Sequence, residues 1–233
     1  MGMAMPTETE RALYRLMSWL SPSYPVGAFS YSHGIEWVVE TGTVHDADTL
    51  RGWVERLLVQ GGGWNDAIFF AHAWQAAHEG DDEALGRVAE LAAAFATSRE
   101  RRLETCAQGD AFVSVTERAW PCDALARLRS VWDGRVAYPV AVAVTAAGHD
   151  VPLTPALTAT LHAYAANLIS AGVRLIPLGQ TDAQRIGAAL MEPIGTVAAR
   201  APSIPLDDVG GMAVLSDIAS MRHETQCTRL FRT

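Results

Sequence analysis

Lysine is missing from this 233-residue chain, whose eighteen Lys and Arg residues are all arginine. A Schiff-base enzyme needs a reactive lysine, and a P-loop nucleotide site needs the lysine of its GxxxxGK[ST] motif. Neither can be built from this sequence. If the protein takes part in nucleotide chemistry, a partner must hold the nucleotide.

Positive charge is also scarce overall. The formal net charge is −8 and the isoelectric point is near 5.3. A nucleic-acid-binding protein needs a basic surface to displace counterions from phosphates, so we expect no nucleic-acid partner. A basic protein partner is compatible with this charge.

Cysteines are few and far apart: Cys106, Cys122 and Cys227, with no CxxC pair. An odd, sparse set is typical of a reduced, cytoplasmic protein. Charged residues from Glu8 to Arg15 come too early for a signal peptide. The longest apolar run, residues 136–148, is too short for a membrane span and contains Pro139. We therefore expect a cytoplasmic location and no membrane partner.

Alternation of apolar and polar residues, the mark of a β-strand, is not sustained anywhere, whereas helical spacing recurs along most of the chain. The pattern predicts an all-α fold: a single domain of about ten helices. Residues 139–147 are apolar all round, which indicates a buried central helix. Thr7 with Glu10 predicts a capping box for a first helix with Leu13, Leu16, Met17 and Leu20 on one face. Asp46 predicts the cap of a helix over 47–60.

The segment 167–185, NLISAGVRLIPLGQTDAQR, predicts two helices that meet at an elbow. Pro177 stops the first helix, and Gly179 can adopt a positive φ, which a turn between helices often requires. Thr181 with Gln184 resembles a capping box that restarts a helix at Asp182. The elbow carries four polar candidates for recognition: Arg174, Gln180, Asp182 and Arg185.

After Ala201 the helical pattern thins, which divides the chain into a helical domain, residues 1–201, and a C-terminal loop and tail, residues 202–233. Arginines cluster in this tail beside Leu230 and Phe231. A tail with so little apolar content does not offset its ordering entropy alone. We expect it to be partly flexible and to order by docking onto a partner.

Catalytic and metal-binding motifs are not found, so we expect no catalytic residues, no bound metal and no cofactor. Ser30, Ser32, His33 and Glu36 form no GxSxG motif, and hydrolase chemistry is the weaker interpretation. His223 and Cys227, four residues apart, are compatible with a soft or borderline metal. Two ligands alone make a weak site, so packing beneath a partner is favoured for them.

Three motifs together resemble the urease accessory protein F family. They are SPSYPVGAFSYSHGIE (21–36), the elbow segment 167–185 and HETQCTRLFR (223–232). Each motif mixes glycine, proline and polar residues in a fixed order, and together they span the chain. Two positions depart from the family pattern: Ala183 replaces a glycine, and Cys227 replaces an aromatic residue, usually tyrosine.

The resemblance implies an all-α, non-catalytic urease maturation chaperone. Members of the family form homodimers, bind a second accessory protein (D or H) and recruit the nickel-carrying accessory GTPase (G), which delivers nickel to apo-urease. By this likeness the chain modulates GTP hydrolysis or nickel release. An arginine finger at Arg174, reaching the nucleotide of the GTPase, is a further idea with less support.

The resemblance also assigns two sets of contacts. The face toward the GTPase or the dimer partner contains Tyr24, Phe29, Ser32, Glu36, Arg174, Gln180, Asp182 and Arg185. The face toward the D/H protein contains Arg222, His223, Glu224, Arg229, Leu230, Phe231 and Arg232. Two other classes stay open: a nickel-binding carrier, and an all-α enzyme that depends on Ser32, His33 or Glu36.

Overall fold

Local capping signals set several helix ends in the computed structural model, which describes residues 5–233. Thr7 and Glu10 form the predicted capping box, with the Thr7 N–H donating to Glu10 over 2.7 Å. Asp46 accepts a hydrogen bond from the Thr49 N–H at the start of the next long helix. Both pairs satisfy backbone donors that the first helical turn leaves without partners.

The described residues form twelve α-helices and three short 3₁₀-helices, with no strand among them. The all-α prediction is confirmed. The helices are α1 (Glu8–Trp19), α2 (Ile35–Glu40), α3 (Ala47–Gln60), α4 (Gly62–Glu79), α5 (Asp82–Ala94), α6 (Arg99–Ala119), α7 (Asp123–Val131), α8 (Tyr138–Gly148), α9 (Leu153–Leu175), α10 (Gln180–Ala189), α11 (Met191–Arg200) and α12 (Val214–His223). The 3₁₀-helices are η1 (Ala28–Ser30), η2 (Ala201–Ser203) and η3 (Leu206–Asp208).

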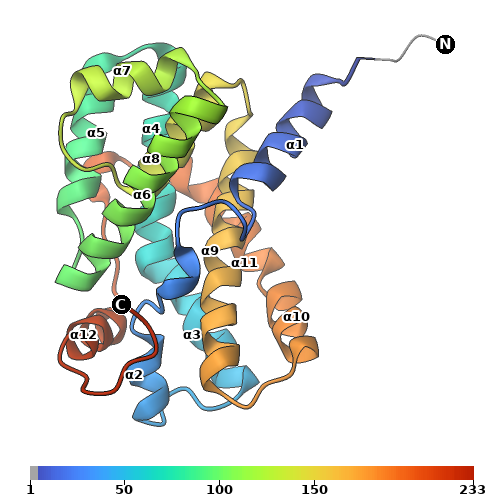
Figure 1. The fold of residues 1–233 in the computed structure, drawn as a ribbon, viewed down its shortest axis with the longest axis vertical. Coiled ribbons are helices and arrows are strands. Elements are labelled where there is room, and N and C mark those ends of the chain that lie inside the picture. The colour runs from blue at the N-terminus through green and yellow to red at the C-terminus, as the bar shows by residue number, and fades with distance from the viewer. Residues whose placement is uncertain (1–4) are drawn as a thin grey trace.

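The all-round apolar segment is the central helix, as predicted. Every residue of α8 from Pro139 to Ala147 is buried, and α8 packs against α4, α5, α6, α7 and α9. Figure 1 shows α8 enclosed by its neighbours in the upper part of the molecule. A helix without a polar face is stable only in such an enclosed position.

Several helix boundaries and faces differ from the predictions. The elbow is present between α9 and α10, but its cap is Gly179, whose N–H donates to Asp182 over 3.2 Å, and not the Thr181–Gln184 pair. The buried side of α1 is formed by Ala12, Leu16 and Trp19, whereas Leu13 and Met17 are exposed. The spacing of apolar residues alone does not show which side of a helix is buried, because that depends on the neighbouring helices.

The C-terminal tail lies against the helical domain. Helix α12 packs on α2 and α6, and the chain end lies beside residues 30–32, as Figure 1 shows around the label C. Gly34 makes the contact with α12 possible, because a Cβ atom there would lie 2.8 Å from the Ser220 nitrogen. In the described conformation residues 230–233 are hydrogen-bonded to residues 30–36.

No helix in the described part of the chain has both the length and the apolar character that crossing a bilayer requires.

Candidate functional site

The three motifs that carry the family resemblance meet in space, although they lie at the start, the late middle and the end of the chain. Arg174, near the end of α9, donates from Nη1 to the Phe29 carbonyl oxygen over 2.8 Å. The same guanidinium lies 4.3 Å from the centre of the Phe231 ring, a cation–π geometry. One side chain of the second motif therefore contacts both the first and the third.

Glu36, at the start of α2, holds the backbone of the tail. Its carboxylate accepts hydrogen bonds from the Leu230 N–H over 2.6 Å and from the Phe231 N–H over 2.9 Å. The side chain of Glu36 is buried. Hydrogen bonds to an ionised acceptor are about twice as strong as neutral ones, so Glu36 fixes where the tail turns across α2.

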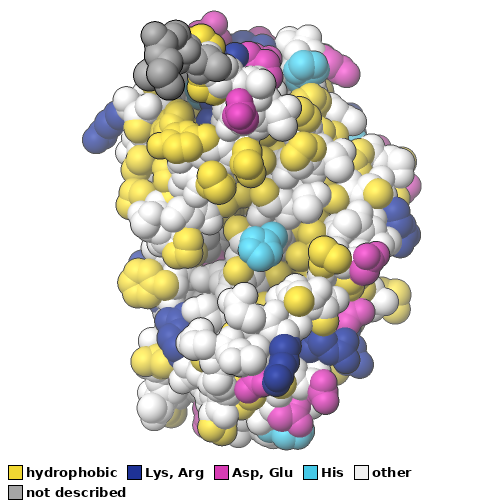
Figure 2. All heavy atoms as spheres, turned by 90° about the vertical axis from the view of Figure 1, so that its right-hand side faces the viewer, with side chains coloured by type: hydrophobic (Ala, Val, Ile, Leu, Met, Phe, Trp, Pro, Cys, Tyr) yellow, Lys and Arg dark blue, Asp and Glu magenta, His cyan; other side chains and the backbone are white. Residues whose placement is uncertain are grey.

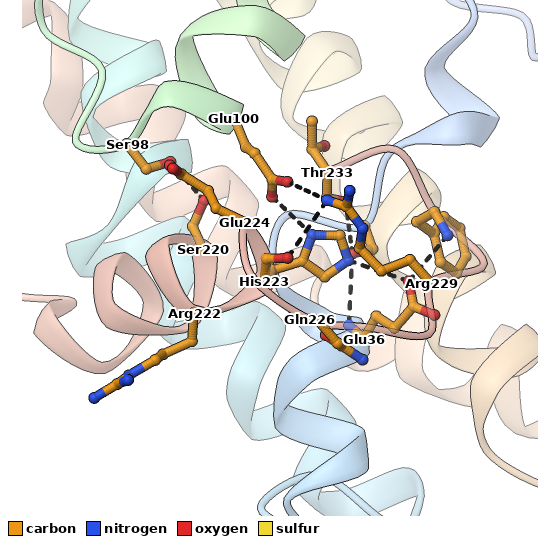
Figure 3. Close-up of polar contacts among 12 residues, drawn as sticks. Glu36, Ser98, Glu100, Ser220, Arg222, His223, Glu224, Gln226, Arg229 and Thr233 are labelled. Carbon is orange, nitrogen blue, oxygen red and sulfur yellow. Dashed lines mark hydrogen bonds and ion pairs between the residues drawn. The ribbon is translucent and has the colours of Figure 1, made fainter.

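His223, the last residue of α12, lies between two carboxylates and is fully buried. Its Nδ1 is 2.7 Å from Glu100 of α6, and its Nε2 is 3.2 Å from Glu36. Arg229 of the tail donates to the other oxygen of Glu100 over 2.8 Å. Figure 3 shows the two carboxylates on either side of the imidazole with Arg229 above it. We call Glu36, Glu100, His223 and Arg229 the tail clasp.

A second buried cluster lies one helical turn further along α6. Glu104 pairs with Arg101 over 2.6 Å, lies 3.1 Å from His33 and accepts from the Thr233 hydroxyl over 3.1 Å. Tyr164 of α9 approaches the other nitrogen of His33 at 3.1 Å. We call His33, Asp66, Arg101, Glu104 and Tyr164 the inner cluster.

Burial and charge shift the acids of the inner cluster in opposite directions. For Glu104, burial acts to raise the pKa, but Arg101 and His33 outweigh it and lower the pKa to about 2. For Asp66, burial dominates and raises the pKa to about 6 despite Arg101. Burial lowers the pKa of His33, and Arg101 lowers it further, which keeps the imidazole neutral.

Two cavities adjoin the inner cluster and share His33, Asp66, Arg101 and Thr105 as lining residues. One, of about 220 Å³, lies toward α5 and α12. The other, of about 290 Å³, lies toward the N-terminal loop and α9.

The residues predicted to face the GTPase or a second copy divide between surface and interior. Phe29, Arg174, Gln180 and Arg185 are exposed, and Asp182 is half-buried. Tyr24 is half-buried, and its hydroxyl lies 2.8 Å from that of Thr116. Ser32 and Glu36 are buried, so in this conformation they hold the tail and present no side-chain surface to a partner.

The residues predicted to face the D/H protein divide in the same way. Arg222, Leu230 and Arg232 are exposed, while His223 and Phe231 are buried. Arg229 is exposed at the edge of the clasp, and Glu224 is half-buried and accepts from the Arg99 N–H over 3.0 Å. The buried pair faces the domain of its own chain.

The geometry does not favour the two weaker interpretations. The Ser32 hydroxyl donates to the Thr233 carbonyl oxygen over 2.7 Å and not to His33, so these two residues do not pair as nucleophile and base. Both ring nitrogens of His223 face carboxylates, whereas Cys227 is exposed, so they do not form a common metal site. Within residues 5–233 no three His, Cys, Asp or Glu side chains are grouped to hold a metal ion.

The sequence motifs did not identify the acidic residues of α6 as part of the site. Glu100, Glu104 and Gln108 recur every four residues, and such a stripe is usually a solvated helix face. All three are buried here. Two sequence features together could have indicated these acids: their four-residue spacing, and the presence of His33 and His223 in the motifs. A histidine that is buried requires a hydrogen-bond partner that is also buried.

Comparison with known proteins places the chain among urease accessory proteins. The UreF family model matches residues 44–191. The urease accessory protein UreF of Rhodopseudomonas palustris strain HaA2 is 53% identical over 229 residues, which cover 98% of this chain and 97% of the relative. The urease accessory protein UreF of Bradyrhizobium sp. strain BTAi1 is 53% identical over 230 residues, which cover 99% of this chain and 95% of the relative.

Proposed function

This chain belongs to the UreF family of urease accessory proteins, and from that premise we propose that it is a non-catalytic scaffold for urease maturation. It binds the accessory D/H protein, and together they recruit the nickel-carrying accessory GTPase to apo-urease. Nickel is the cargo of this assembly. The scaffold modulates GTP hydrolysis or nickel release and works in the cytoplasm as a homodimer.

The observation that carries this proposal is the meeting of the three motifs at Arg174. Arg174 links the backbone of Phe29 to the ring of Phe231. Two side chains at these contact points are exposed, Phe29 at 71% and Leu230, the neighbour of Phe231, at 66%. Aromatic side chains and arginine are enriched at protein interfaces. We call Phe29, Arg174 and Leu230 the composite surface, and we assign it to partner recruitment.

Helix α12 supports a docking role for residues 202–233 as a unit. Its inner side packs on α2 and α6, while its outer side exposes a row of apolar residues at helical spacing: Val214, Leu215, Ile218 and Met221. We propose that this row, continued by Leu230, meets the D/H protein. The buried His223 and Phe231 act indirectly, by holding the tail in place.

Helices α1 and α10 lie on the other side of the molecule from α12 (Figure 1). Figure 2 shows apolar side chains gathered over the upper half of that side. Leu13, Tyr14 and Met17 of α1 are more than half exposed. We assign this side, with Gln180 and Arg185 of the elbow, to the GTPase or to the second copy in the dimer.

The test is co-purification with the D/H protein, measured by size exclusion with light scattering. Truncation after Gly211 removes all of α12 and uncovers α2, so a point variant is the sharper probe. Leu230→Asp places a charge on the composite surface and keeps the four clasp residues and the Leu230 backbone N–H that binds Glu36. Met191→Asp is the matched control, because Met191 of α11 is 67% exposed and lies outside the proposed surface.

We expect Leu230→Asp to weaken complex formation at least tenfold while Met191→Asp leaves it unchanged. A wild-type chain that ignores the D/H protein would refute the scaffold proposal. Equal binding by wild type and Leu230→Asp would refute the assignment of the composite surface.

A further inference from the structure

We propose that His223 is a proton-dependent lock of the C-terminal tail: the tail closes with a doubly protonated imidazole and opens when that proton is lost. This inference concerns the folding of the chain onto itself. It needs no partner and stands apart from the scaffold proposal.

The geometry at the imidazole carries the proposal. Each ring nitrogen of His223 faces a carboxylate oxygen, Nδ1 at 2.7 Å from Glu100 and Nε2 at 3.2 Å from Glu36. A carboxylate accepts hydrogen bonds and does not donate them, and a neutral imidazole carries only one N–H. While Glu36 and Glu100 are both ionised, both contacts are hydrogen bonds only if His223 has a proton on each nitrogen.

The charge balance of the tail clasp leads to the same conclusion. Glu36 and Glu100 bring two negative charges into a site where His223 has no solvent exposure. Arg229 offsets one of them through its contact with Glu100. The imidazolium of His223 offsets the other, whereas a neutral imidazole would leave an unbalanced buried carboxylate, a costly arrangement.

Other charged groups around the clasp are engaged elsewhere. On α12, Arg222 points away from His223 in Figure 3, and Glu224 accepts from the Arg99 N–H. On α6, Arg101 and Glu104 pair with each other. On α2, Glu40 accepts a hydrogen bond from the Gln226 side chain. The protonation of His223 is therefore set by Glu36, Glu100 and Arg229.

The direction of the pH effect follows from a proton count. In the open form His223 meets water, where histidine loses its proton near pH 6.5. Above that pH, closing the tail takes up one proton, so the ratio of closed to open tail falls as pH rises. One proton per closure limits the change to about tenfold per pH unit.

The lock also explains why distant tail residues close together. Glu36 accepts from both His223 and the N–H groups of Leu230 and Phe231. Glu100 accepts from both His223 and Arg229. When His223 loses its proton, the two carboxylates are held less firmly in place. Each of them also binds a part of the tail that is several residues away from His223.

The first experiment observes the proton directly in the full-length wild-type chain. Nitrogen-15 NMR of the histidine rings at pH 7.5 distinguishes an imidazolium from either neutral tautomer. We expect both nitrogens of His223 to carry protons at this pH. A neutral ring in the closed chain would overturn the proposal.

The second experiment measures hydrogen exchange of residues 224–233 between pH 6 and pH 9, with the intrinsic pH dependence of exchange removed. We expect the protection of the tail to fall by up to tenfold per pH unit above about pH 6.5, while α8 stays protected. In His223→Gln, which cannot gain a charge, the pH dependence should disappear. His162→Gln, a change at an exposed histidine of α9, is the matched control and should keep the wild-type slope.

A tail whose protection does not change with pH, or a His223→Gln variant that keeps the wild-type slope, would overturn the lock. Circular dichroism checks that the variant keeps its helices. If it does not fold, the NMR result on the wild-type chain decides.

Discussion

Two glycines with the same backbone conformation allow the contact between α2 and α12 to be isolated. Gly34 has φ +77° and Gly42 has φ +74°, so both lie in the left-handed region. A Cβ at Gly42 would have no neighbour within 4 Å, whereas one at Gly34 would lie 2.8 Å from the Ser220 nitrogen and 3.0 Å from the Ala219 carbonyl carbon. Gly34→Ala and Gly42→Ala therefore share the backbone strain and differ only in the clash.

The expected magnitudes follow from those two contributions. Placing alanine in the left-handed region costs about 1–2 kcal/mol in either variant. The clash at Gly34 is with backbone atoms of α12, which do not rotate away, and overpacking of this kind costs about 1–3 kcal/mol. Gly42→Ala should lower the free energy of unfolding by about 1–2 kcal/mol, and Gly34→Ala by about 2–5 kcal/mol.

The clash also has a structural consequence beyond stability. Moving α12 away from Gly34 lengthens the contact between the Ser98 and Ser220 hydroxyls, now 2.6 Å, and draws His223 away from Glu36. The measurements are urea unfolding followed by circular dichroism and hydrogen exchange of residues 224–233. Tail protection should fall in Gly34→Ala and not in Gly42→Ala. Equal unfolding free energies, or an unchanged tail in Gly34→Ala, would refute the reasoning.

Three further changes test the inner cluster and the elbow. Burial raises the pKa of Asp66 to about 6, so stability is lost as the pH rises from about 4 to about 6, and the whole penalty is present above that pH. Asp66→Asn should therefore raise the free energy of unfolding by about 1–3 kcal/mol at pH 7.5 and change it little at pH 4, as urea titrations at both pH values will show. Glu104 changes the stability of the fold with pH in the opposite direction. Burial alone would raise its pKa, but Arg101 lowers it to about 2, so the ionised Glu104 stabilises the fold above pH 4.5, and this contribution is lost toward pH 2. Glu104→Gln should therefore cost about 2–4 kcal/mol at pH 7 and progressively less below pH 4, in the same titrations. Arg174→Met removes the guanidinium from the Phe231 ring and should reduce tail protection about 5- to 30-fold by hydrogen exchange, corresponding to about 1–2 kcal/mol, whereas the matched Arg185→Met should leave it unchanged.

Periodicity and capping signals predicted much of the helical fold because they are local. The Thr7–Glu10 box, the Asp46 cap and the apolar run of α8 all depend on residues within a few positions of one another. Directions of helical faces were harder to predict: Leu13 and Met17 share a spacing with Leu16 but lie outside the contact with the core. Which side of a helix is buried depends on neighbours that local spacing does not specify.

The candidate site was predicted in its parts but not in its arrangement. The motifs identified Glu36, Arg174 and His223, yet sequence order gave no sign that Glu36 contacts His223 or that Arg174 contacts Phe231. The tail was expected to lack enough apolar surface to order alone, an argument that counted apolar area only. In the described conformation it is hydrogen-bonded to Glu36 and Glu100, and Glu100 lies on a helix that no motif had marked.

The two buried acids of α6 explain why the tail closes in one position only. Glu100 and Glu104 lie one turn apart on a helix packed against the central α8, so their carboxylates are held in place. Each carboxylate has two polar partners. Glu104 contacts His33 and the Thr233 hydroxyl, and Glu100 contacts His223 and Arg229. An apolar tail of the same size would tolerate a shifted register, because burial of apolar area has no direction. A buried carboxylate is stable only with its partners in place, so a shifted tail would leave Glu100 uncompensated. The composite surface at Phe29, Arg174 and Leu230 is therefore presented in a single geometry, as the scaffold role proposed above requires.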